Sequence, residues 1–104
     1  MLHILWRFRA KADKVEEFRR VYAGNGDWAK LFARAADYRG TELWEDLSDP
    51  AVFVVVDHWG TREAYERFRR QFGAEYEALD ESCCELTDEE TPLGNFWSAT
   101  PDAS

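Results

Sequence analysis

Two hydrophobic periodicities divide the first part of the chain into a strand and two helices. Apolar and polar residues alternate over residues 2–9, which predicts a strand whose core side carries Leu2, Ile4, Trp6 and Phe8. A helical spacing follows, with the apolar stripe Val15, Phe18, Val21 and Tyr22. After the break at residues 24–26, we expect Asp27 to cap a short helix with the apolar face Trp28, Leu31, Phe32 and Ala35.

The second part of the chain predicts two strands, a long helix and a last strand. Residues 40–47 and 52–59 are joined by the turn Ser48-Asp49-Pro50, which is typical of an antiparallel hairpin. Thr61 caps the longest helix, with the stripe Tyr65, Phe68, Phe72, Tyr76 and Leu79. We expect the last strand to begin near Cys84 and to include Leu86, and the apolar segment 93–97 to dock onto the domain.

This order of elements predicts an α+β protein with a ferredoxin-like (split βαβ) fold and a four-stranded antiparallel sheet. The helices must lie on one face of the sheet, because both crossovers are right-handed. We expect one domain over residues 1–97, followed by a disordered tail over residues 98–104.

The third strand is apolar on both faces. Phe53 and Val55 lie on one side, and the other side carries Val52, Val54 and Val56. A sheet open to water on one side should alternate apolar with polar residues, and the chain has no further element to cover the second face. We therefore expect a homodimer with its sheets packed face to face, which buries on the order of 1,200–2,000 Å² or more.

Composition and charge narrow the functional classes. Hydrophobic residues make up 45%, which argues against disorder, and the net charge of −8 argues against binding to nucleic acid or to an anionic membrane. The sequence has no apolar run of the ~20 residues needed to span a bilayer, and no signal peptide is visible. These features predict a cytoplasmic location.

The residues able to bind metal are few. Cys83 and Cys84 are adjacent, a spacing that disfavours a disulfide, so we expect free thiols. Together with only His3 and His58, they do not make a metal site.

The chain resembles the antibiotic biosynthesis monooxygenase family over about residues 1–97. The resemblance rests on the order of elements, the first strand, residues 38–43, and Phe53-Val54-Val55-Val56-Asp57-His58-Trp59 followed by Ala64-Tyr65 and Phe68. It implies a ferredoxin-like protomer and a dimeric α+β barrel. Some members are cofactor-independent monooxygenases that act on aromatic polyketides such as anthrones, so the resemblance implies no cofactor.

The resemblance also implies site residues. Trp59 and Tyr65 are similar to a Trp and a Tyr that line the pocket of these oxygenases, while Val55 stands where they have an Asn. Haem-degrading members have an Asn on the first strand and a His after the Tyr. Both are missing here, where the helix carries Arg69 and Arg70, so the axial iron ligand is absent.

Four residues are candidates for catalysis. Trp59 and Tyr65 are suited to bind and polarise a flat aromatic substrate, although both are also typical of core packing. Asp57 shares the strand face of Val55, where burial would raise its pKa as a general base requires, but at a strand end we favour a solvated turn acid. His58 points to the opposite face, where we favour interface packing over a role as base.

The other candidates are walls of a substrate pocket, namely Trp6, Trp28, Phe32, Val55 and Phe72. The leading hypothesis is a cofactor-independent monooxygenase that uses O₂ on a small aromatic or polyketide-like substrate. The alternative is a non-catalytic small-ligand-binding or accessory protein with the same dimeric barrel, so it remains open whether the chain is an enzyme. Haem degradation ranks below both.

Overall fold

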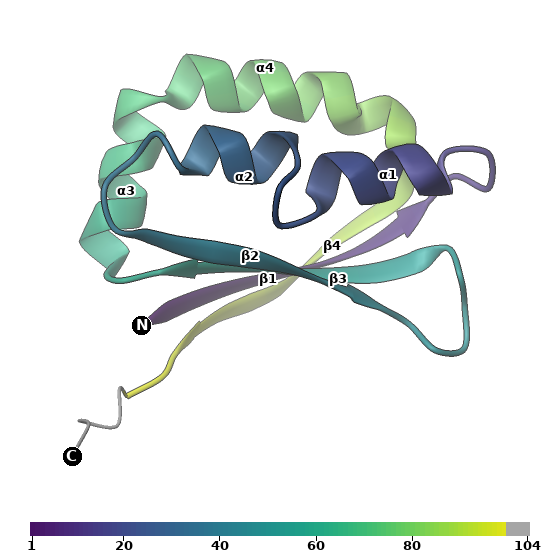
Figure 1. The fold of residues 1–104 in the computed structure, drawn as a ribbon, viewed down its shortest axis with the longest axis horizontal. Helices are drawn as coiled ribbons and strands as arrows, with labels where there is room; N and C mark the ends of the chain where they lie inside the picture. The colour runs from purple at the N-terminus through teal and green to yellow at the C-terminus, as the bar shows by residue number, and fades with distance from the viewer. Residues whose placement is uncertain (100–104) are drawn as a thin grey trace.

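The computed structural model describes residues 1–99 and places all four helices on one face of a four-stranded antiparallel sheet (Figure 1). The elements, in chain order, are β1 (Leu2–Ala10), α1 (Val15–Tyr22), α2 (Asp27–Phe32), β2 (Tyr38–Glu45), β3 (Val52–Trp59), α3 (Arg62–Gln71), α4 (Gly73–Cys83), the 3₁₀ turn η1 (Cys84–Leu86) and β4 (Thr87–Trp97). The sheet order is β2-β3-β1-β4. This is the predicted ferredoxin-like α+β fold, with the first and third strands at the centre.

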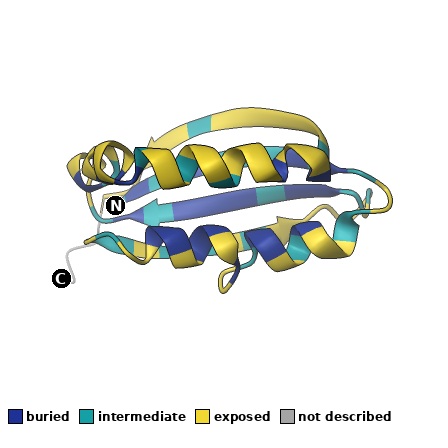
Figure 2. Cartoon of the chain, turned by 90° about the horizontal axis from the view of Figure 1, so that it is seen from above, coloured by how far each residue is buried: buried dark blue, intermediate teal, exposed yellow. Residues whose placement is uncertain are grey.

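The core lies between the two central strands and the helices (Figure 2). The alternation in β1 buries Leu2, Ile4 and Phe8, as the sequence predicts. Phe18 of α1 stacks on Phe53 of β3 with ring centroids 4.9 Å apart, and both side chains are 0% exposed. Such aromatic pairs add to the stabilisation from burial alone. They fix the helix layer against β3, which carries the candidate residues.

The helix after Thr61 begins as predicted but does not continue to Leu79. The Thr61 hydroxyl accepts the Ala64 N–H at 3.1 Å and caps α3. The helix then breaks at Phe72 (φ −114°, ψ 25°), and Gly73 starts α4. The prediction of a single long helix is therefore wrong, because the apolar spacing continues across a change of direction in the backbone.

The last strand also differs from its prediction. It begins at Thr87 rather than near Cys84, because residues 84–86 form η1, and Leu86 is buried there. Residues 93–97 are the end of this strand and not a separate docking segment. Ser98 donates its backbone N–H to the Met1 carbonyl at 3.0 Å. The rest of the expected tail, from residue 100, lies outside the described residues.

Among residues 1–99, no helix covers the second face of the sheet (Figure 1). Val52 and Val56 on this face are each 2% exposed within a single chain, so they need no further cover. Larger apolar side chains remain exposed, namely Trp44 on β2 at 49% and Phe96 on the edge strand β4 at 52%.

Within the described residues, no helix is long and apolar enough to cross a membrane.

Candidate active site

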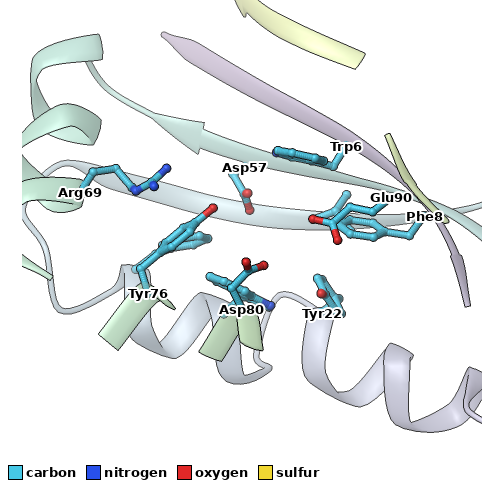
Figure 3. Close-up of a pocket in the computed structure, with 11 residues that line it drawn as sticks. Trp6, Phe8, Tyr22, Asp57, Arg69, Tyr76, Asp80 and Glu90 are labelled. Carbon is cyan, nitrogen blue, oxygen red and sulfur yellow. The ribbon is translucent and has the colours of Figure 1, made fainter. Parts of the chain in front are cut away.

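A cavity of about 320 Å³ lies between the sheet and the helices (Figure 3). Its size is that of a small-molecule site, and its walls come from three strands and all four helices. Five of the residues that the sequence singles out line it: Trp6, Trp28, Phe32, Val55 and Asp57. The alternation of side chains along β1 and β3 explains why the sequence identified strand residues that line the cavity. Trp6, Val55 and Asp57 all lie on the face of the sheet that carries the helices.

Asp57 is a buried carboxyl group in the wall of this cavity. The residue is 9% exposed, and its side chain points from β3 toward the centre of the cavity (Figure 3). The expectation of a solvated turn acid is wrong, because β3 continues to Trp59 beneath the helix layer. Burial raises the pKa of Asp57 to about 6, against the opposing effects of the Thr41 hydrogen bond and the charge of His58.

Two hydroxyl groups connect to Asp57. The Thr41 hydroxyl donates to Asp57 Oδ1 at 2.7 Å, so it accepts in turn from the Tyr38 hydroxyl at 2.5 Å. Tyr38 and Thr41 are an odd number of residues apart and would face opposite sides of a regular strand. The pairing of β2 with β3 shifts by one residue between Tyr38 and Gly40, and this β-bulge lets both hydroxyls share the face of Asp57.

Trp59 and Tyr65 lie beside the cavity, not among its lining residues. Trp59 is 0% exposed and packs edge-on against Phe32, which does line the cavity, with centroids 5.6 Å apart. Its indole Nε1 has no hydrogen-bond partner among residues 1–99. The Tyr65 hydroxyl accepts a hydrogen bond from Arg69 Nη1 at 3.0 Å, and Arg69 lines the cavity. Each of the two residues therefore contacts a side chain that lines the cavity, without lining it directly.

The remaining two candidates lie away from the cavity. His58 is on the uncovered face of the sheet, where its Nε2 bonds Glu42 at 2.6 Å and its Nδ1 lies 2.7 Å from Nδ1 of His3. Phe72 is buried at the break between α3 and α4 and stacks on Phe68 with centroids 5.5 Å apart.

The sequence did not indicate the polar residues at the mouth of the cavity. Arg69 of α3 lies 3.9 Å from the ring centroid of Tyr76 on α4 and lines the cavity with it. Asp80 of α4 and Glu90 of β4 complete this set, although their acidic neighbourhoods suggest a solvated surface. The sequence does contain the helical spacing of Tyr76 and Asp80, which are four residues apart on α4. The position of Glu90 opposite Phe8 follows from the pairing of β1 with β4, which only the structure shows.

Metal-binding groups are dispersed in the described part of the chain. No three His, Cys, Asp or Glu side chains among residues 1–99 are close enough to hold a metal ion. Cys83 is buried and Cys84 is exposed, and both are free thiols, as expected. What the cavity offers is a buried carboxylate among aromatic walls, an arrangement suited to removing a proton from a flat organic ligand.

Comparisons with known proteins agree with this fold. A protein of Nitrosomonas europaea assigned to the antibiotic biosynthesis monooxygenases superposes with a TM-score of 0.72 at 17% identity, covering 96% of this chain and 100% of that chain. SnoaB, a cofactor-independent oxygenase from Streptomyces nogalater, superposes with a TM-score of 0.70 at 21% identity, covering 99% of this chain and 97% of its own.

A third similar structure is a NIPSNAP domain protein of Burkholderia xenovorans, with a TM-score of 0.67, 20% identity and 95% of each chain covered. No curated protein matches the chain. At these low sequence identities, the three solved structures show that this chain shares their fold. The family model of antibiotic biosynthesis monooxygenases, in contrast, matches the sequence itself over residues 1–78. The chain belongs to the antibiotic biosynthesis monooxygenase family.

Proposed function

We propose that this protein is a cofactor-independent monooxygenase that oxidises a small aromatic, polyketide-like substrate with O₂. The observation that carries the proposal is Asp57, a buried carboxylate with a pKa of about 6 in the wall of a cavity of about 320 Å³. A general base works best when its pKa lies near the operating pH. Family membership and the similarity to SnoaB support the same reaction class.

The reaction begins with the transfer of a proton from an acidic C–H group of the substrate to Asp57. The electron pair stays on the substrate as a carbanion stabilised by the aromatic rings, and this carbanion reduces O₂ directly. When a CH₂ group becomes a carbonyl group, one oxygen atom of O₂ enters the product and the other leaves as water. The substrate supplies all the electrons, so the proposal needs no bound cofactor.

The remaining candidates hold the substrate against Asp57. Trp6, Trp28, Phe32 and Val55 are the apolar walls that bind the flat rings. Trp59 supports Phe32 from behind, and Tyr65 orients Arg69 at the mouth. His58 and Phe72 have no part in this proposal, because neither lines the cavity.

The proposal includes a homodimer that forms through the uncovered face of the sheet. Trp44 and Phe96 expose apolar surface there, as described above. Two copies that pack face to face would bury these side chains and complete the dimeric barrel.

A second candidate function is non-catalytic binding of a similar ligand. Val55 favours it, because an apolar side chain faces the cavity where the resembling oxygenases have an Asn. A binding protein would take up the aromatic ligand in the same cavity without consuming O₂.

Oxygen uptake with anthrone tests the proposal. We expect the wild-type protein to accelerate uptake above the background autoxidation of anthrone, and Asp57→Asn to reduce this rate by about 10²–10⁴-fold, the usual contribution of a general base. Asp88→Asn is the control, because it removes the same charge from an exposed position on β4. Binding of anthrone without uptake would favour the second candidate, and equal rates in wild type and Asp57→Asn would exclude Asp57 as the base.

A further inference from the structure

The mouth of the cavity carries two carboxylates that form no ion pair within residues 1–99. Asp80 and Glu90 line the cavity, and neither lies within 4.0 Å of a Lys, Arg or His nitrogen in residues 1–99. The adjacent Glu89, in contrast, contacts both Arg7 and Arg9. Burial and the charge of Asp80 raise the pKa of Glu90, so the two carboxylates repel each other across the mouth.

The balance of charge in the whole lining is acidic. The lining includes three carboxyl groups, those of Asp57, Asp80 and Glu90, and one cation, Arg69. The carboxyl groups converge on a common space (Figure 3), while Arg69 donates to Tyr65 and stacks on Tyr76. The net field of the cavity therefore attracts a positive charge and repels a negative one.

Two buried polar groups of the same cavity can form further hydrogen bonds. Trp28 lines the cavity and is 6% exposed, yet its indole Nε1–H has no acceptor among the described residues. Asp57, which is 9% exposed, makes its one side-chain hydrogen bond within residues 1–99 through Oδ1, with Thr41 as donor. A buried polar group without a partner costs free energy, which a ligand recovers when it supplies the missing donor or acceptor.

The aromatic walls determine which kind of cation fits. Trp6, Phe8 and Tyr22 line the same cavity as the carboxylates, and ring faces attract organic cations. A bare metal ion does not fit, because no three suitable ligands of residues 1–99 lie close enough together.

We propose that the cavity binds an aromatic ligand that carries a protonated amine, with the ammonium group between Asp80 and Glu90 and the rings against Trp6 and Phe8. This inference rests on the proposed function in one respect, since it takes the cavity as the substrate site. It adds the substrate class, namely aromatic amines. The ammonium group would also help to keep Asp57 ionised, because a nearby positive charge favours the carboxylate.

Calorimetry with two probes of equal shape tests this inference. The probes are 2-(aminomethyl)naphthalene, a cation at pH 7.5, and 2-naphthalenemethanol, its neutral counterpart. We expect the amine to bind about three- to tenfold more tightly at low salt, and the difference to shrink at about 0.5 M salt, because charges at an exposed mouth are screened. Equal affinities for the two probes, or no binding of either, would overturn the inference.

A pair of variants with the same net charge locates the effect. Asp80→Asn combined with Glu90→Gln should abolish the preference for the amine, whereas Glu81→Gln combined with Glu85→Gln, at exposed positions outside the cavity lining, should retain it. A preference that survives in the cavity variant would overturn the assignment. These readouts are independent of oxidation: anthrone turnover without amine preference would overturn this inference alone, and amine preference without turnover would overturn the proposed function alone.

Discussion

The acidity of Asp57 lies between that of an ordinary surface carboxyl group and that of a buried carboxyl group that stays neutral. Burial raises its pKa to about 6, and the Thr41 hydroxyl partly compensates by donating to the carboxylate. In the apolar surroundings of Trp6 and Val55 the ionised form is costly, and this cost makes the carboxylate a stronger base than it would be in water. The same property that suits it to accept a proton therefore makes it a source of instability.

The cost of ionising Asp57 predicts a pH-dependent stability. The pKa in the folded protein, about 6, lies above the usual value of 3.8, so the penalty is absent below pH 3.8 and complete above pH 6. Between pH 4 and pH 7.5 we expect the free energy of unfolding of the wild type to fall relative to Asp57→Asn by about 2–3 kcal/mol. Urea denaturation of both proteins at each pH measures this, with Asp88→Asn as the control that should follow the wild type. A difference that does not change with pH would show that Asp57 is not buried as described.

The sequence predicts the face of each strand residue but not its depth. The alternation in β1 and β3 placed Trp6, Val55 and Asp57 together on the helix side, and they do line one cavity. Periodicity could not show that Asp57 is buried, because burial depends on where the helices lie above the strand end. For the same reason it could not show that Trp59 is 0% exposed and sits beside the cavity.

Among the elements, β2 shapes the site most through its irregularity. The bulge between Tyr38 and Gly40 brings Tyr38 and Thr41 onto one face, and Gly40 adopts φ +114° there, a conformation that only glycine adopts readily. No pattern in residues 40–47 indicated this bulge, and the predicted strand began at Gly40 instead of Tyr38. The helix break at Phe72 was missed in the same way, since hydrophobic spacing does not record a local change in φ and ψ.

Gly40→Ala tests the role of the bulge. A side chain at φ +114° is strained, so we expect a loss of about 1–3 kcal/mol in the free energy of unfolding. Gly73→Ala is the matched control: a Cβ at either glycine meets no atom within 4 Å, but only Gly40 has a positive φ. Gly73→Ala should be neutral or stabilising by up to about 1 kcal/mol. Equal effects of the two substitutions in urea denaturation would contradict this account of β2.

At the scale of the whole molecule, the uncovered sheet face is the surface through which we propose that two copies associate. The valines of β3 led to the prediction of a dimer, but two of them, Val52 and Val56, are already buried within one chain. The large apolar side chains that stay exposed on this face are Trp44, which is 49% exposed, and Phe96 of the edge strand. A single chain leaves this apolar surface in contact with water, and a second copy would remove it.

Sedimentation equilibrium tests this prediction. We expect a dimer at micromolar concentration, and we expect Trp44→Lys to shift it toward monomer, because the substitution places a charge in the interface. Leu47→Lys is the control, since Leu47 is fully exposed beyond the end of β2 and should not affect association. A wild-type monomer, or an equal effect of the two lysines, would contradict the proposed dimer.

The central claim is that an ionised Asp57, tuned by Thr41, removes a proton from a substrate held in the cavity. The pH dependence of kcat/KM for anthrone oxidation tests it most directly in wild type and Thr41→Val. The account predicts a rate that rises with pH through an apparent pKa near 6 in the wild type. It also predicts a higher apparent pKa in Thr41→Val, because the substitution removes the hydrogen bond that stabilises the carboxylate. A rate that does not depend on pH, or an identical profile in Thr41→Val, would contradict it.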